Sequence, residues 1–152
     1  MDAVSLIKAT RHALAECASM PEIVSEAWQA QALAEAIGSR LAVTGPALVR
    51  AEALSLSESG GRACHSLPES ALGAGEVRAA RLSEIQDPRC ALLDLAELLG
   101  ETGVALVGVA VSAEEEGLYW QCIEAIDAAD ESGDRVAGIL RRLEPQEHGG
   151  AI

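Results

Sequence analysis

The residues of this chain best suited to chemistry are two cysteines, Cys64 and Cys90. Cys90 is expected in the first turn of a helix beside Arg89, where the helix dipole and the cation both favour a thiolate. Asp87, three residues earlier, opposes that effect. The sequence therefore offers Cys90 as a candidate reactive thiol, and the simpler alternative is a semi-exposed thiol without a special role.

Motifs for metals and cofactors are incomplete. Cys64 and His65 could supply two zinc ligands, but no further pair has zinc-site spacing. A carboxylate-bridged two-metal centre needs Glu-x-x-His motifs, and His12, His65 and His148 have no Glu three residues before them. The segment 103–108 begins like a phosphate-binding loop but is not followed by its Lys. We therefore expect no metal site and no cofactor, and binding rather than catalysis.

The most informative pattern is an amphipathic helix expected over residues 112–143. Its inner side repeats apolar residues at steps of three and four, and its outer side is acidic with one Trp. No cation interrupts that outer side, so its like charges repel one another. We call the outer residues the acidic strip: Glu116, Trp120, Glu124, Asp127, Glu131 and Asp134.

Trp120 makes the acidic strip a candidate contact surface, because Trp is enriched where proteins meet partners. Trp28 lies away from the apolar stripe of its own expected helix and is a second candidate contact. The alternative is a solvated acidic face, with both Trp side chains packed under a loop or a neighbouring helix.

Composition narrows the class of protein. The chain has 152 residues, enough for one domain with a core. Its 24 acidic and 11 basic residues give a net charge of −13, which repels nucleic acids and anionic lipid surfaces. Aromatic residues make up only 2%, with no Phe, and Ala is abundant. This composition favours closely packed helices over a sheet.

The sequence predicts a cytoplasmic protein that does not enter a membrane. The N-terminus lacks the basic start and apolar run of a signal peptide. The most apolar stretch, Gly103–Val111, is nine residues long, whereas a span needs roughly 20. The four Cys residues form no Cys-x-x-Cys pair, so we expect free thiols.

Apolar spacing and capping residues predict helices over residues 3–18, 19–43, 46–58, 76–85, 88–111 and 112–143. Ser19 and Asp87 are expected N-caps, and Ser112 is expected to open the last helix. Residues 104–111 alternate Val with small residues and could form a buried strand. Because no second strand is available to pair with it, we predict a helix there.

These elements predict an all-α fold, a bundle of four principal helices in which segments 46–58 and 76–85 are short connectors. A single domain is expected over residues 1–144, followed by a flexible tail at 145–152. Residues 59–75 are rich in Gly, Ser and Pro and predict a mobile or functional loop, longer than bundle connections usually are.

Three segments also resemble a known group of proteins: MDAVSLIKATRHALAEC, EIVSEAWQAQALAEAIGSRLAV and EEEGLYWQCIEAIDAADESGDRV. They are similar to an uncharacterised family from streptomycetes and other actinobacteria, over nearly the whole chain. The resemblance implies a GC-rich source, in agreement with ten Arg and one Lys. It implies no activity, cofactor or catalytic residue.

The sequence thus predicts a small interaction module whose acidic strip binds a protein with a basic surface or a second copy of the chain. The alternative is a ligand-binding bundle, or a minor enzyme. Its pocket would be closed by the 59–75 loop and lined by Cys64, His65 or Cys90.

Overall fold

The described residues fold mainly into α-helices. The computed structural model describes residues 1–67 and 75–149, with side chains up to Glu144. Within these residues there is no strand, only an isolated bridge between Asp2 and Glu84. The all-α prediction is confirmed. The elements are α1 (Ala3–Ala15), α2 (Met20–Thr44), η1 (Ala47–Val49), α3 (Arg50–Ser66), η3 (Arg78–Arg81), α4 (Pro88–Ser112) and α5 (Glu116–Gly149).

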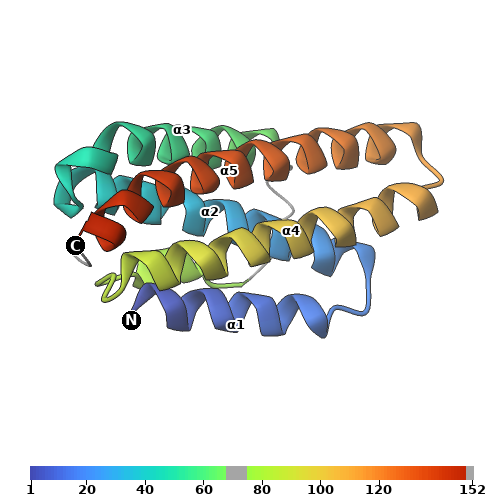
Figure 1. Cartoon of the computed structure of the whole chain (residues 1–152). Helices are drawn as coiled ribbons and strands as arrows, with labels where there is room; N and C mark the ends of the chain where they lie inside the picture. Colours follow the sequence, from blue (N-terminus) through green and yellow to red (C-terminus); the bar gives the residue numbers. More distant parts are fainter. Residues whose placement is uncertain (68–74, 150–152) are drawn as a thin grey trace.

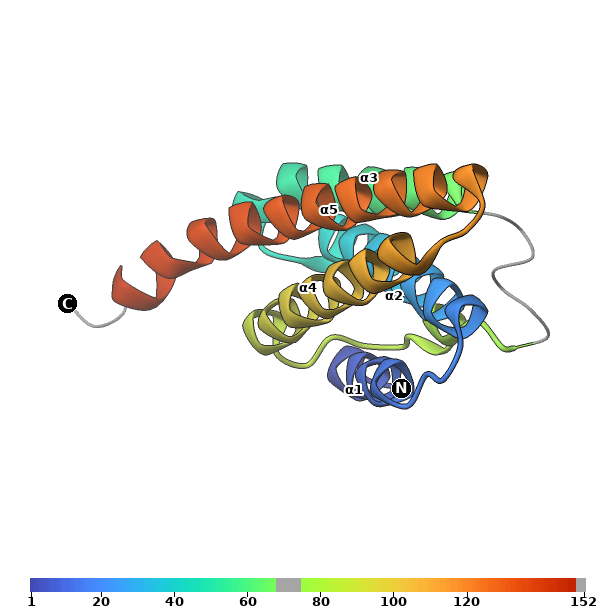
Figure 2. The ribbon, with the colours of Figure 1, turned by 90° about the vertical axis from the view of Figure 1, so that its right-hand side faces the viewer.

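The helices lie roughly along one direction in layers (Figure 1). α2 and α3 form one antiparallel hairpin, and α4 and α5 form another. Seen from the right-hand side of Figure 1, α3 and α5 lie uppermost, α2 and α4 in the middle, and α1 lowest (Figure 2). The outward surfaces of α4 and α5 therefore face the same side of the molecule, towards the viewer in Figure 1.

Side-chain caps start the helices where the sequence predicts them. The Ser19 hydroxyl accepts a hydrogen bond from the Glu22 amide at 3.4 Å, and the Glu22 carboxylate accepts one from the Ala18 amide at 3.1 Å. The Asp87 carboxylate accepts from the Cys90 amide at 3.2 Å at the start of α4. These bonds satisfy amides that have no partner within their own helix.

The main core lies between all five helices and is almost entirely aliphatic. Burying each of its large side chains stabilises the fold by about 1.5–3 kcal/mol. α4 contributes the most of them, because it packs against α1, α2 and α5. The largest fully buried side chains are Leu6, Ile7, Leu33, Ile37, Val49, Leu56, Leu92, Leu95, Leu98, Leu99, Leu106 and Ile139.

The predicted loop over residues 59–75 is wrong in its first part, because α3 continues to Ser66. Gly60 is a packing residue and does not end the helix. A Cβ at Gly60 would lie 2.7 Å from the Gln31 carbonyl oxygen and 2.7 Å from the Glu35 amide nitrogen, both in α2. The glycine therefore allows two helices to approach closely, and α3 is more than a short connector. Residues 68–74 of the expected loop lie outside the described residues.

Three other boundaries differ from prediction. Of the expected helix 76–85, only a 3-10 turn at Arg78–Arg81 forms. It is tied to α2, since the Gln29 side chain accepts from the Arg78 amide at 3.0 Å. Ser112 ends α4 and does not open the next helix, which begins at Glu116 and continues to Gly149, beyond the expected end at 143. Residues 104–111 are helical, as predicted.

Helix α4 is the one helix among the described residues that is long and apolar enough to cross a membrane, judged by length and composition alone. The fold buries only 39% of its most apolar 18-residue window. α4 is therefore both a core helix and a source of exposed apolar surface.

Candidate functional site

The acidic strip lies on the outer side of α5. Trp120 is 55% exposed, and Glu116, Glu124, Asp127 and Asp134 are exposed as well. The reason is helical geometry, since these positions are opposite Cys122, Ala125, Ala129 and Val136, which are buried. The strip is therefore open to solvent along the first half of α5.

Trp120 does not stand alone on this surface. The ring of Tyr119 lies edge to face with the Trp120 ring, with centroids 5.3 Å apart and planes at 79°. Tyr119 is itself 40% exposed. Two aromatic rings in this arrangement stabilise each other beyond the area they bury, so they present one semi-rigid aromatic surface.

The charge pattern of the strip differs from prediction at one residue. Glu131 is half-buried and paired: Arg62 of α3 contacts its carboxylate at 2.7 Å and Arg135 contacts it at 3.7 Å. The expectation that no cation relieves the strip is wrong there, because α3 supplies a cation that the α5 pattern does not contain. Glu116, Glu124, Asp127 and Asp134 form no ion pair with any described residue.

Helix α4 exposes a row of valines on the same side of the molecule. Val104 is 75% exposed, Val107 is 48% exposed and Val111 is 81% exposed. Their spacing of three and four residues places them on one face of α4, opposite Leu99, Leu106 and other core residues. No charged residue lies between Glu101 and Glu114. This part of α4 is therefore a charge-free apolar surface.

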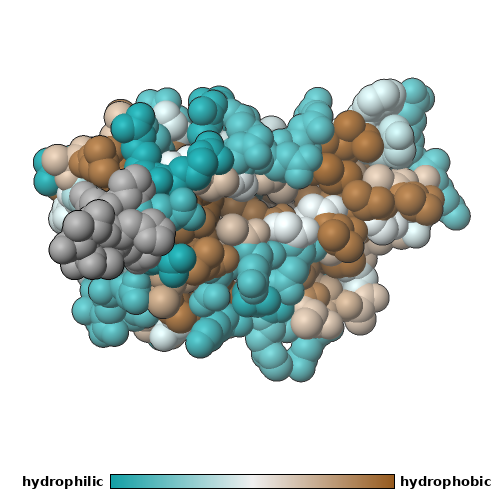
Figure 3. Space-filling model, in the orientation of Figure 1, coloured by the Kyte–Doolittle hydropathy of each residue, from teal (hydrophilic) through white to brown (hydrophobic). Residues whose placement is uncertain are grey.

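The last valine of the row, Val111, and the aromatic pair lie near the adjoining ends of the two helices, since only residues 113–115 separate α4 from α5. Figure 3 shows apolar side chains gathered over this end of the α4 and α5 surface, with hydrophilic side chains above and below. We call the following exposed side chains at this end of α4 and α5 the outer face: Val104, Val107, Val111, Tyr119 and Trp120, continued along α5 by the acidic strip.

Trp28 is placed differently from Trp120. It is half-buried and packs against a second core cluster that includes Ala27, Leu67, Leu106 and Ala125. Its backbone carbonyl accepts a hydrogen bond from the Cys64 thiol at 3.7 Å. Trp28 therefore supports the packing of α2 against its neighbours, and the structure does not bring it into the outer face.

The thiols are held in their neutral forms. Cys90 is exposed, and its pKa is raised because the Asp87 carboxylate accepts a hydrogen bond from the thiol and repels a thiolate; Arg89 opposes this more weakly. Burial, followed by the charge of Glu35, raises the pKa of Cys64 to about 12. Among the described residues, no group of three His, Cys, Asp or Glu side chains could hold a metal ion.

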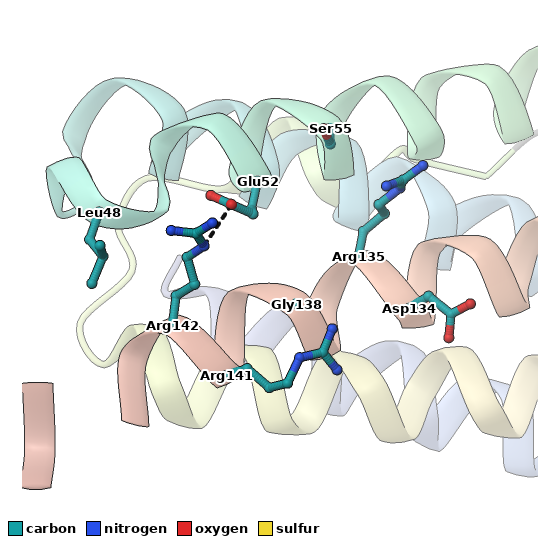
Figure 4. A pocket seen from close by; sticks show the side chains of 8 residues that line it. All are labelled: Leu48, Glu52, Ser55, Asp134, Arg135, Gly138, Arg141 and Arg142. Atoms are coloured by element: carbon teal, nitrogen blue, oxygen red, sulfur yellow. Dashed lines mark ion pairs between the residues drawn. The ribbon is translucent and has the colours of Figure 1, made fainter. Parts of the chain in front are cut away.

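A separate hollow of about 590 Å³ lies between the start of α3 and the later turns of α5 (Figure 4). Its charged pair is Arg142 with Glu52, whose Nε and Oε1 atoms are 2.7 Å apart. The residues around it are Leu48, Glu52, Ser55, Asp134, Arg135, Gly138, Arg141 and Arg142.

Residues 1–142 match the model of a family of unknown function, DUF6099. The chain belongs to this family. No curated protein and no solved structure matches the chain. The family match includes α4 and most of α5, so the outer face lies within the family region. The expectation of a family without known function is confirmed, while the actinobacterial source stays a prediction.

Sequence reasoning missed four residues of the outer face: Val104, Val107, Val111 and Tyr119. A signal for the valines was present, because the pattern of α4 is apolar on the side opposite its core stripe as well. A helix that is apolar all round is either fully buried or contacts something else. Tyr119 had no such signal in the sequence.

Proposed function

We propose that this protein is a protein-interaction module and that the outer face is its contact surface. The observation that supports this most is the exposure of Val104, Val111 and Trp120, at 75%, 81% and 55%. Isolated exposed apolar residues are common, but a contiguous group of them with a polar rim is typical of interaction sites. The helical scaffold then serves to hold this surface rigid.

The charges next to the apolar surface support a basic partner. Glu116, Glu124, Asp127 and Asp134 are exposed and form no ion pair with a described residue, and the whole chain carries −13. A partner helix with apolar residues on one side and Lys or Arg along its edge would complement both features. A second copy of the chain would instead bring like charges together. We infer that the partner is basic and that the protein acts in the cytoplasm.

The arrangement of the helices that carry the outer face is part of the same proposal. We infer a bundle in which α2, α3, α4 and α5 are the principal helices and α1 covers one side of α2 and α4. In this arrangement α4 has neighbours on its inner side only, and its valines remain available to a partner.

Photocrosslinking identifies the partner and tests the surface in one experiment. A benzophenone amino acid in place of Trp120 is expected to crosslink one basic protein in the source cells, which is then purified. Binding of that protein is measured by calorimetry against the unmodified chain. Trp120→Ala is expected to weaken binding by about 30-fold, the size of an interface hot spot. Leu54→Ala is the control, because Leu54 is 53% exposed on α3, away from the outer face.

Salt dependence tests the charge part of the proposal. Glu124→Gln with Asp127→Asn is expected to weaken binding and to reduce its dependence on NaCl, because charges on a contact rim act mainly through screened attraction. Equal losses from Trp120→Ala and Leu54→Ala would overturn the surface assignment. A crosslinked homodimer whose affinity increases with added NaCl would show self-association and overturn the basic partner. Retention of the protein on neutral lipid vesicles would instead show that the surface binds a membrane.

A further inference from the structure

The hollow between α3 and α5 adjoins the acidic strip at Asp134 and has the size of a small-molecule site. Its volume is about 590 Å³, within the roughly 300–1,000 Å³ of such sites. Leu48, which is 43% exposed, forms an apolar part of its wall, and the half-buried Ser55 offers a hydroxyl group.

Cations are concentrated here in a chain that has few of them. Arg135, Arg141 and Arg142 are three of the 11 basic residues, and all three line this hollow. They come from one stretch of α5, where Arg135 and Arg142 lie on the side towards α3 and Arg141 lies on the other side of Gly138 (Figure 4). Figure 4 shows Arg142 directed from α5 towards Glu52 on α3, and Arg141 extended along α5 beside Gly138.

The carboxylates near these arginines do not neutralise all of them. Glu52 neutralises Arg142 at 2.7 Å. Arg135 has only a 3.7 Å contact to Glu131, whose carboxylate already binds Arg62 at 2.7 Å. Arg141 forms no ion pair with a described residue, and Asp134 points away from the pair of Arg142 and Glu52 (Figure 4). Three arginines and two carboxylates, those of Glu52 and Asp134, line the hollow, so positive charge is in excess there.

Gly138 keeps space open between the arginines. A Cβ at this position would meet only the Arg141 Nη2 atom, at 3.8 Å. The missing side chain is therefore not required by close packing of another helix, unlike Gly60. It leaves room beside the Arg141 guanidinium group, and guanidinium groups bind phosphates and carboxylates through paired hydrogen bonds.

We propose that this hollow binds a small organic phosphate. Arg141 and Arg135 contact the phosphate oxygens, and Leu48 contacts the apolar part of the molecule. Phosphate is favoured over a carboxylate because its larger set of terminal oxygens can accept paired hydrogen bonds from more than one guanidinium group. Binding is expected to strengthen as the pH rises through about 6, where an organic phosphate acquires its second negative charge.

Titration of the full chain with phenyl phosphate, followed by amide NMR at constant ionic strength, tests the site. Saturable shifts are expected for amides of residues 48–55 and 134–142 at millimolar ligand. Arg141→Gln is expected to weaken binding about tenfold or more, the loss typical of a charged hydrogen bond. Lys8→Gln removes the same charge from an exposed position of α1 and is expected to change nothing.

Two further titrations, one with a second variant and one with a second ligand, complete the test of the phosphate site. Gly138→Leu is expected to fill the hollow and abolish binding while circular dichroism shows a folded chain; if that variant does not fold, Arg141→Gln decides. Benzoate has the same ring with a single charge and is expected to bind more weakly. Binding of benzoate equal to that of phenyl phosphate would overturn the phosphate assignment. Shifts elsewhere, or equal losses from Lys8→Gln and Arg141→Gln, would overturn the site.

Discussion

The hydroxyl oxygens of Ser59 in α3 and Ser132 in α5 lie 2.8 Å apart in the buried interior. Ser132 donates its own proton to the Gln31 side-chain oxygen of α2, also at 2.8 Å, and therefore accepts from Ser59. All three residues are at most 4% exposed. This chain of hydrogen bonds fixes the relative positions of three helices, because a shift of any one would leave a buried polar group without a partner.

Ser132→Ala is expected to lower the free energy of unfolding by about 1–3 kcal/mol, since it leaves the Gln31 oxygen and the Ser59 hydroxyl unsatisfied. Urea denaturation followed by circular dichroism measures the loss. Ser5→Ala, at an exposed position of α1, is the control and should change stability by less than about 0.5 kcal/mol. Equal stability of the two variants would show that the chain of hydrogen bonds does not stabilise the fold.

Gly60→Ala is expected to destabilise the protein by about 1–3 kcal/mol or more, because the new methyl group meets α2 backbone atoms that have no freedom to move aside. Gly133→Ala is its matched control. No atom lies within 4 Å of a Cβ at Gly133, so Ala should stabilise α5 by up to about 1 kcal/mol through helix propensity. Thermal unfolding should show a lower Tm for Gly60→Ala and a higher Tm for Gly133→Ala. Changes in Tm of the same sign would contradict the close contact of α2 and α3.

Asp87→Asn is expected to change how stability depends on pH. The backbone hydrogen bond from Cys90, followed by the hydrogen bond from its thiol, lowers the pKa of Asp87 below its ordinary 3.8. A carboxyl group with a lowered pKa in the folded state stabilises the protein above pH 3.8, and this contribution is lost as the pH falls through the lowered value.

The difference in urea midpoint between the natural chain and Asp87→Asn should therefore be largest at neutral pH and vanish in strong acid. Asn is also a good N-cap, so this substitution isolates the charge. A difference that stays constant from neutral to acidic pH would exclude a role for the carboxylate charge at the start of α4.

Alkylation by iodoacetamide should distinguish the thiols. Cys90 is expected to react first in the folded protein because it is exposed, and Cys64 last because burial raises its pKa to about 12. Asp87→Asn should speed the reaction of Cys90 at pH 8, since the group that raises the pKa of this thiol loses its charge. Peptide mass spectrometry measures both rates. An unchanged Cys90 rate would show that Asp87 does not control this thiol.

Local patterns in the sequence determine the helical class and most of the elements. The apolar spacing of α4 and α5 and the caps at Ser19 and Asp87 each depend on residues within one or two turns of each other, so they are visible without a fold. The exposure of Trp120 follows from the same spacing. The acidic strip was therefore found from the sequence, and its role as a partner site stays a proposal.

Contacts between segments distant in sequence determine the features that local sequence patterns do not show. Gly60 has the sequence signature of a loop, and only the approach of α2 shows that it is a packing residue within α3. Arg62 neutralises Glu131 across 69 positions of the chain, and the hollow with Arg135 and Arg141 forms only where α3 meets α5. The exposed valines of α4 depend on which side of that helix has no neighbour. A one-dimensional pattern specifies which side of a helix is apolar, and only the tertiary packing decides which apolar side remains uncovered.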